Sequence, residues 1–395
     1  MTLITRQSDF DQLCEKIEQA GIVAFDTEFS SESYYRPRLC LLQFAFDDVI
    51  AGVDPFEVTD LSMWWEIMAD DKTTVVIHGG REEVRFCQFA IHKRPRKLLD
   101  VQIAEGLRSR GFPISHTNLV NRVLNTSVKH GKETRTDWER RPLAEKQIQY
   151  ALEDVHHLIE IWETQQQSLN ELNRLSWAEA EFERFVEDVF AEEQREGWLR
   201  LSGFSRLSRR DMATAKALFQ WRDQIAFEKN KPPRRVLRDD LLIDVAKRQP
   251  KTLKDLNMVR DMNRRDYQQH AEEILSVIKQ AIQIAEEDLP PKQKGKQYPS
   301  QDEVLARILG LALANRCQEL GISMPLVGTT SDLKELVRWH VFDNQRGKTP
   351  KLLEGWRGEV CGKILTDVLD GNVSLRVVDP RSENPLSFDV DRTAS

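Results

Sequence analysis

Long apolar runs are absent from this sequence of 395 residues, and cysteine is scarce. No stretch approaches the roughly twenty apolar residues that cross a bilayer, and the first residues lead into a polar segment rather than the apolar core of a signal peptide. The five cysteines are odd in number and none lies in a CxxC spacing, which argues against a disulfide framework and against structural zinc. We therefore expect a protein without membrane association in the reducing cytoplasm.

An overall excess of basic charge is also missing, because the formal net charge is −7. Residues 204–270 differ from the rest, since they carry 17 lysine and arginine residues against 9 aspartate and glutamate residues, a local balance of +8. An acidic body with one basic module is typical of enzymes that hold cations at one site and bind phosphates elsewhere. A solvated, charged helix surface explains the same numbers equally well.

The order of the predicted elements divides the chain. Residues 1–167 begin with antiparallel strands and continue with alternating strands and helices, which predicts a mixed α/β sheet with helices on its faces. The rest reads as helical, and the total length fits two or three domains. We expect a helical connector at 168–203, a helical domain at 204–288, a linker rich in proline and lysine at 289–300, a second helical domain at 301–375 and a disordered tail at 376–395.

Acidic residues follow a clearly predicted buried strand at residues 22–25. Asp26 and Glu28 come next, and they share one side because strand side chains repeat every second residue. Tyr150 and Asp154 are four residues apart, so they share one face of the helix predicted there. Three carboxylates and a phenol form a set of hard oxygen ligands suited to Mg²⁺ or Mn²⁺ and to phosphodiester cleavage with two metal ions. An Asp-x-Glu pair alone is weak evidence, because such pairs occur on many solvated strand ends.

The motifs of the chain, taken in order, resemble the ribonuclease D family, in the tyrosine subgroup of the DEDD superfamily of 3′-to-5′ exonucleases. The resemblance runs to about residue 369 and implies a ribonuclease H-like exonuclease domain followed by two helical domains of the helicase-and-ribonuclease-D C-terminal (HRDC) type. The motifs that carry it are Asp26-Thr27-Glu28-Phe29, the strand end at His78, Arg135-Thr136-Asp137-Trp138 with Arg141-Pro142-Leu143, Tyr150-x-x-x-Asp154 and Gly355-Trp356-Arg357-Gly358-Glu359.

The same resemblance assigns roles to the acidic residues. It implies that Asp26, Glu28 and Asp154 hold one ion, that Asp26 bridges to a second ion near Glu83, and that Tyr150 orients the attacking water. The family has aspartate where this chain has Glu83. Glutamate keeps the charge and the oxygen ligands but is longer by one methylene, so the placement of the second ion and the full activity are in question.

Candidate substrate contacts lie around these acids and in the basic module. Phe29 and His78 take the positions where a terminal base or ribose would lie, and an aromatic face gives stacking that tolerates any base. Basic side chains are expected to contact the phosphate backbone without reading sequence. These residues are Lys132, Arg135, Arg141, Arg234 and Arg235, although Arg135 could equally pair with Asp137 within the fold.

The function expected from the resemblance is a metal-dependent 3′-to-5′ exoribonuclease that trims RNA 3′ ends, with transfer RNA precursors as the partner RNA. A DNA 3′-to-5′ exonuclease of the same superfamily is the first alternative. The second is a nucleic-acid-binding protein whose catalytic site has weakened, with Glu83 as the first sign. The sequence predicts no particular oligomeric state.

Overall fold

The computed structural model describes residues 2–126, 136–194, 196–291 and 301–390. These residues form two compact units, each described here by itself. The first unit combines Met1–Glu28, Leu41–Phe190 and Gln297–Ser395, and the second combines Phe29–Cys40 with Ala191–Lys296. The C-terminal helical part thus belongs to the same compact unit as the N-terminal sheet, although the sequence suggested a separate domain there.

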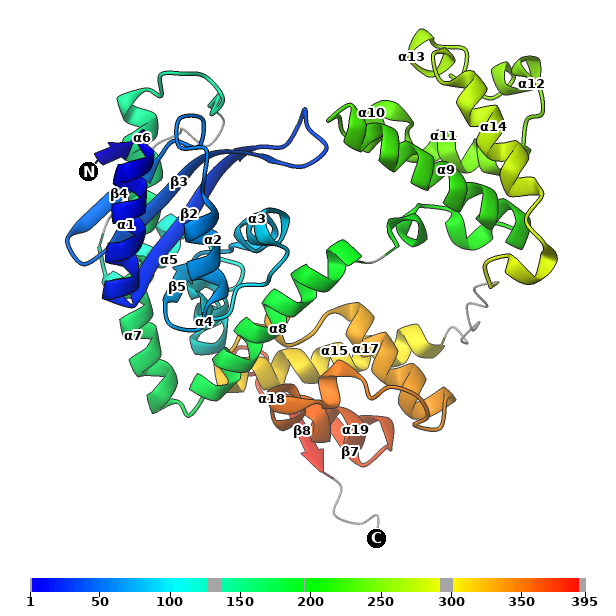
Figure 1. Ribbon diagram of the computed structural model, residues 1–395. Coiled ribbons are helices and arrows are strands. Elements are labelled where there is room, and N and C mark those ends of the chain that lie inside the picture. Colours follow the sequence, from blue (N-terminus) through cyan, green and yellow to red (C-terminus); the bar gives the residue numbers. More distant parts are fainter. Residues whose placement is uncertain (1, 127–135, 195, 292–300, 391–395) are drawn as a thin grey trace. The chain divides into compact units, whose positions relative to one another are not determined.

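A six-stranded sheet of order β1-β4-β3-β2-β5-β6 forms the centre of the N-terminal part (Figure 1). β2 and β6 each pair in parallel with β5, and β1 pairs in parallel with β4, whereas β3 and β4 are antiparallel. The mixed sheet predicted from the sequence is therefore confirmed. The strands are β1 (Thr2–Ile4), β2 (Ile22–Ser30), β3 (Arg38–Phe46), β4 (Val49–Val53), β5 (Thr74–Ile77) and β6 (Leu98–Asp100).

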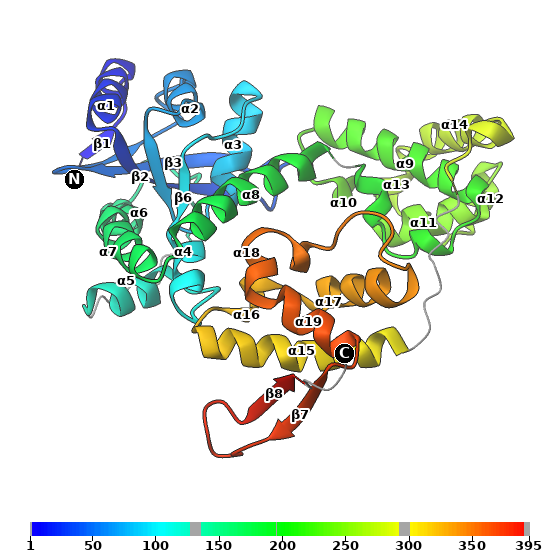
Figure 2. The same cartoon turned by 90° about the horizontal axis from the view of Figure 1, so that it is seen from below.

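Helices cover both faces of this sheet, with α1, α2 and α3 on one face and α4 to α7 on the other (Figure 2). Double coverage explains why consecutive residues of β2, Val23, Ala24 and Phe25, are all buried rather than alternating. The helices are α1 (Gln7–Ala20), α2 (Ser62–Ala69), α3 (Arg81–Ile91), α4 (Val101–Arg108), α5 (His116–Leu124), α6 (Glu145–His156) and α7 (Leu158–Glu171).

The C-terminal helices of the first unit share its hydrophobic core. Buried Leu309 and Leu336 belong to the same cluster as Ala24 and Val76 of the sheet. An ion pair fixes α8 (Leu175–Gln194) to this part, because both guanidinium nitrogens of Arg357 donate to the Glu181 carboxylate at 2.7 Å with both side chains almost fully buried. The elements are α15 (Gln301–Leu320), α16 (Met324–Val327), α17 (Thr330–Val337), η5 (Arg338–Phe342), η6 (Lys351–Leu353), α18 (Gly355–Arg357), η7 (Gly358–Gly362) and α19 (Lys363–Leu369).

The chain after α19 differs from the prediction of a disordered tail at 376–395. β7 (Val373–Val377) and β8 (Leu386–Val390) pair as an antiparallel two-stranded sheet. Apolar residues at every second position, such as Leu375 facing Phe388, explain the pairing. The abundance of proline, serine and charge in this segment concealed that alternation.

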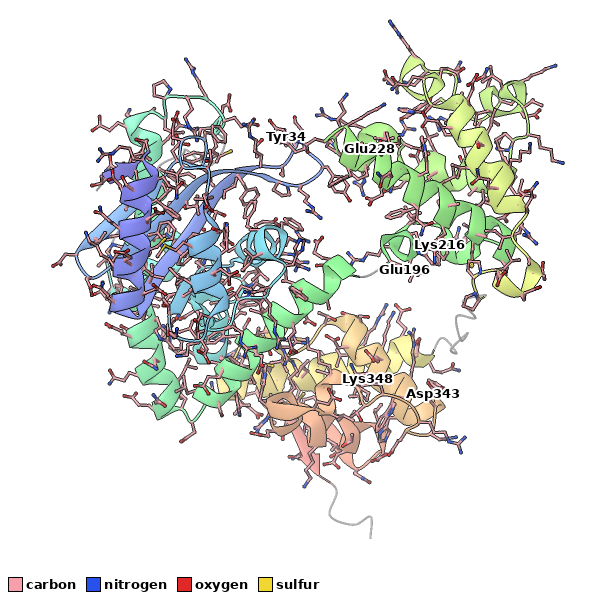
Figure 3. All side chains as sticks on the ribbon, in the orientation of Figure 1. Tyr34, Glu196, Lys216, Glu228, Asp343 and Lys348 are labelled. Carbon is pink, nitrogen blue, oxygen red and sulfur yellow. The ribbon has the colours of Figure 1, made fainter. Side chains whose placement is uncertain are left out.

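The second unit is helical, as predicted. Its long helix α9 (Arg209–Glu228) begins at Ser208, whose hydroxyl accepts the backbone N–H of Asp211 in a capping box. Figure 3 shows Lys216 of this helix facing Glu196, and their charged groups lie 2.8 Å apart. The other elements are η2 (Gly197–Arg200), η3 (Phe204–Arg206), α10 (Pro233–Val236), α11 (Asp239–Arg248), α12 (Leu253–Asn257), α13 (Arg265–Gln268), α14 (Ala271–Ile282) and η4 (Glu286–Asp288).

Among the described residues, none of the helices combines the length and the apolar character needed to span a bilayer.

Candidate active site

The site is built at the end of β2, an interior strand of the sheet. Ala24 pairs with Val76 of β5, and two residues further along β2 its side chains change from apolar to acidic. Asp26 and Glu28 are half-buried, whereas Thr27 between them is buried on the opposite side of the strand. The strand therefore presents two carboxylates together on one side, as the sequence predicted.

Four carboxylates lie near one another at this place, and the charges of Glu83, Asp154 and Glu28 all act on Asp26. The pKa of Asp26 is raised well above its usual range by burial, then by the charges of Glu83, Asp154 and Glu28. The pKa of Glu28 rises to about 8, again through burial first and then through Asp154 and Glu83. Partly buried acids whose neighbours raise the pKa values of Asp26 and Glu28 hold unbalanced negative charge, which a bound cation would neutralise.

Glu83 lies in the first turn of α3 and is only 4% exposed. Its Oε1 accepts a hydrogen bond of 2.5 Å from the hydroxyl of Thr27. Burial raises the pKa of Glu83 to about 7, and the hydrogen bond from Thr27 opposes that rise. Gly80 makes room here, since a Cβ at that position would lie 2.3 Å from Ile77 and 3.0 Å from the Glu83 carboxylate.

Tyr150 and Asp154 come from successive turns of α6, as their spacing predicted. Tyr150 is 8% exposed and packs near Trp138, with ring centroids 6.4 Å apart. Its pKa is raised by burial and then by Asp154, Glu28 and Asp26. The phenol therefore keeps its proton at neutral pH, so it can orient a water molecule but is a poor base.

Two histidines lie beside the acids, and the sequence pointed to only one of them. His78, at the end of β5, places Nε2 3.0 Å from the carbonyl oxygen of Ile114 and 3.3 Å from the amide nitrogen of Gln102. His116, the first residue of α5, places Nδ1 3.3 Å from Oδ1 of Asp154. No sequence signal marked His116, because nothing in its own segment relates it to an aspartate on another helix.

Arg141, one of the predicted substrate contacts, makes contacts within the fold. Arg141 forms an internal ion pair with buried Asp54, with nitrogen–oxygen distances of 2.5 and 2.8 Å. Its guanidinium also lies 4.1 Å from the ring centroid of Phe56. These contacts give Arg141 a structural role within the fold, and its contact with phosphate stays a prediction.

The remaining predicted contacts fall in three places. Phe29 is half-buried in β2, next to Glu28 in the chain. Arg234 and Arg235 are exposed on the second unit, where Arg234 also pairs with Asp239 at 3.0 Å. Lys132 and Arg135 lie outside the described residues.

The donor set fits a hard divalent cation in its chemistry. Carboxylate oxygens from Asp26, Glu28, Glu83 and Asp154 are the ligands that Mg²⁺ and Mn²⁺ prefer. Within the described ranges, no three or more histidine, cysteine, aspartate or glutamate side chains are arranged as a set that encloses an ion. The fit therefore rests on the charge and type of the donors rather than on a formed coordination shell.

Comparisons with known proteins agree with this fold. A family model described as 3′-5′ exonuclease matches residues 1–170, and a model of the HRDC domain matches residues 211–278. Ribonuclease D of Sphingobium indicum is 30% identical over 384 residues, covering 96% of this chain and 97% of that protein. Ribonuclease D of a Shewanella species is 28% identical, covering 92% of each. The crystal structure of Escherichia coli RNase D has a TM-score of 0.81 and 26% identity, covering 93% of this chain and 98% of that chain.

The match over the first 170 residues and the sheet they form make this chain a 3′-to-5′ exonuclease. The similarity to ribonuclease D proteins extends over nearly the whole chain, the helical part included. The chain therefore belongs to the ribonuclease D family, and it is a 3′-to-5′ exoribonuclease. Enzymes of this exonuclease family depend on divalent metal ions.

Proposed function

We propose that this enzyme trims the 3′ ends of structured RNA precursors, with precursors of transfer RNA as its substrates, by hydrolysis that uses two Mg²⁺ or Mn²⁺ ions. The observation that carries the proposal is the gathering of Asp26, Glu28, Glu83 and Asp154 beside Tyr150, in which neighbouring acids raise the pKa values of Asp26, Glu28 and Tyr150. The substrate class is supported by the similar Escherichia coli enzyme, which is described as an exoribonuclease involved in structured RNA processing.

The ions, when bound, supply positive charge that eases loss of a proton from the attacking water and balances the charge that develops on the phosphate and the leaving 3′ oxygen. Asp26 is proposed to contact both ions, because it lies among the other three acids and its pKa responds to all of them. Glu28 and Asp154 would complete the first ion site, and Glu83 would serve the second.

Tyr150 is proposed to hold the attacking water in line with the scissile phosphate. Its phenol keeps its proton at neutral pH, so the hydroxyl can donate to, or accept from, a nearby oxygen without taking the proton permanently. Trp138 packs close to the ring and limits its movement. Orientation of this kind contributes to rate by reducing the freedom that the reacting water must lose.

We propose that the enzyme binds RNA through contacts with the terminal nucleotide and with phosphates further along the RNA. Phe29 and His78 would contact the terminal base or ribose, by stacking that tolerates any base. Arg234 and Arg235, both exposed, would contact phosphates of the RNA body without reading its sequence.

The cytoplasm remains the predicted compartment, in keeping with five buried cysteines that are all free thiols.

One assay tests the proposal as a whole. The purified protein is incubated with Mg²⁺ or Mn²⁺ and with RNA labelled at its 5′ end, in forms with a free and with a blocked 3′ end, beside DNA of the same sequence. We expect stepwise shortening of the free RNA, no shortening of the blocked RNA, and trimming of a transfer RNA precursor that stops at the folded body. Equal degradation of DNA, or cleavage of the blocked RNA, would contradict the proposal.

A further inference from the structure

We propose that His116 is a positioning residue that holds the carboxylate of Asp154 in the orientation needed for metal binding. The inference rests on the proposed function, because it assumes that Asp154 is an ion ligand. It assigns a role to a residue that none of the motifs of the chain includes.

The contact between the two side chains is specific and sheltered. Nδ1 of His116 lies 3.3 Å from Oδ1 of Asp154, and the side chains are 11% and 14% exposed. An ionised carboxylate oxygen can only accept a hydrogen bond, so a hydrogen bond here requires a proton on Nδ1 of His116, in the neutral or the charged imidazole. In a partly buried place such a hydrogen bond to a charged acceptor is stronger than the same contact on the surface.

The helix that carries His116 is fixed by its apolar side. Leu119, Val120 and Val123 of α5 are buried in the main core, together with Val155 and Leu158 that flank the end of α6. The backbones of both partners are therefore anchored in one core. The distance between ring and carboxylate is set by packing rather than by two mobile side chains.

The chemistry of the carboxylate explains why a donor is useful here. Asp154 has two oxygens, and both Asp26 and Glu28 have pKa values raised by its negative charge. In the absence of a cation this repulsion favours rotation of Asp154 away from the cluster. A hydrogen bond to Oδ1 opposes that rotation and keeps the carboxylate turned toward the place where an ion would lie. Hydrogen-bond partners of metal ligands commonly act in this way.

The same short segment also contacts the other side of the site. The ring of His116 lies edge-on to that of His78, with centroids 5.7 Å apart and planes at 76°. Ile114, two residues earlier, offers its carbonyl oxygen to Nε2 of His78. Residues 114–116 thus hold a predicted ion ligand and a predicted substrate contact at once, which explains why an imidazole rather than a small polar side chain suits position 116.

Three substitutions separate positioning from packing. Asparagine can place its amide nitrogen close to the position of Nδ1, glutamine reaches the position of Nε2 instead, and phenylalanine keeps the ring volume without a donor. The variants are therefore His116→Asn, His116→Gln and His116→Phe. Each is compared with the parent in three measurements: binding of Mn²⁺ to the substrate-free protein by electron paramagnetic resonance, the Mg²⁺ dependence of kcat and KM, and the thermal midpoint without metal.

We expect His116→Phe and His116→Gln to weaken Mn²⁺ binding and to raise the half-saturating Mg²⁺ concentration by about 10- to 100-fold. KM for RNA at saturating metal and the metal-free thermal midpoint should stay close to those of the parent. His116→Asn should bind Mn²⁺ within a few-fold of the parent. Should His116→Phe fail to fold, the difference in Mn²⁺ binding between the Asn and Gln variants tests whether His116 positions Asp154.

The inference is overturned if His116→Phe binds Mn²⁺ as the parent does, or if the Asn and Gln variants behave alike. That failure differs from failure of the proposed function. If the parent itself binds no Mn²⁺ and Asp26→Asn leaves cleavage intact, the metal site is wrong. If the parent binds Mn²⁺ and Asp26→Asn abolishes cleavage, while His116→Phe binds like the parent, only the role of His116 is lost.

Discussion

The hydroxyl of Thr27 donates a 2.5 Å hydrogen bond to Oε1 of Glu83, and both side chains are buried. The contact joins the residue between the two acids of β2 to the one acid that departs from the family pattern. Glu83 is longer by one methylene than the aspartate expected there, and its carboxylate is anchored by a hydroxyl from the neighbouring strand. The identities of residues 27 and 83 therefore depend on each other.

This dependence can be measured with a double-mutant cycle. Glu83→Asp shortens the side chain and removes the acceptor, and Thr27→Val removes the donor without changing the volume. Each single change should destabilise the protein by about 1 to 3 kcal/mol, because a buried polar group loses its partner, and each should lower activity. The double variant should cost clearly less than the sum of the two, with Thr27→Ser as a control that keeps the hydroxyl. Additive effects on unfolding free energy and on kcat would show that the contact is not energetically important.

Asp26→Asn should abolish cleavage in Mg²⁺ and in Mn²⁺, a loss of several powers of ten in rate, because Asp26 is proposed to contact both ions. The variant should nevertheless be more stable than the parent when metal is removed by a chelator at pH 8. The raised pKa of Asp26 means that its charge is disfavoured in the folded state, so this penalty is present at pH 8 and vanishes below the ordinary pKa of aspartate.

Thermal unfolding with a chelator at pH 8 and pH 4 checks the stability half of that prediction, and a gel assay on labelled RNA checks the activity half. A substantial residual activity of the Asp26→Asn variant would show that Asp26 is not an essential ion ligand. A variant that is inactive and also less stable at pH 8 would show that the acids of the site do not repel one another.

Acid should weaken the attachment of α8 to the C-terminal helices. Burial alone would raise the pKa of Glu181, but hydrogen bonds from Arg357 and Arg184 outweigh burial and hold that pKa at about 2. An acid whose folded pKa is depressed stabilises the protein above its unfolded pKa and loses that contribution as pH falls. The contribution of Glu181 should therefore be complete at pH 6 and decline from about pH 4.5 toward pH 2.

Glu181→Gln leaves Arg357 as an uncompensated buried charge and should cost about 3 to 5 kcal/mol at pH 7. The difference in unfolding free energy between parent and variant should shrink as pH falls below about 4.5, measured with denaturant. Glu179→Gln, on the exposed side of the same helix, is the matched control and should change little at any pH. A difference between Glu181→Gln and parent that is independent of pH would contradict the assignment.

Reversing the charge of Arg235 should weaken RNA binding more than it slows the chemical step. The side chain is exposed on the basic second unit and supplies no ligand to the acidic site. The slope of log Kd against log salt should become shallower by about one unit for each phosphate contact that is lost. Arg307→Glu, an equally drastic change on an exposed arginine of the first unit, is the control. An unchanged slope for Arg235→Glu would show that this surface does not contact RNA.

Local periodicity paired the site residues that are close in the chain, whereas the link between distant residues, such as Asp26 and Glu83, came from the family resemblance. Asp26 and Glu28 are two residues apart on a buried strand, and Tyr150 and Asp154 are four apart on a helix, so local periodicity was enough to pair them. His116 escaped notice because its partner Asp154 lies on a different helix. The ion pair of Arg141 with Asp54 could not be predicted for the same reason, since it joins residues distant in sequence.

Several helices and strands also could not be predicted from the pattern of residues in their own short segments. β1 and β6 span three residues each, too few to show any periodicity. α6 ends at His156 and α7 begins at Leu158, although no proline or glycine marks the break between them. The C-terminal hairpin shows that a composition typical of disorder can still contain two alternating strands.

The interior place of β2 has a consequence for how this enzyme can change over evolutionary time. β2 lies between β3 and β5, and its residues Ile22–Ala24, which lead into the acids, pair with β5. The strand that carries Asp26 and Glu28 is therefore held by its neighbours in the sheet, and a shift of the strand absorbs a substitution there less readily than a rotation of a helix would. Glu83 and Asp154 lie on helices, where a small rotation can compensate a change in side-chain length. Position 83, where the family resemblance predicts aspartate, lies on the half of the active site that can adjust to a glutamate.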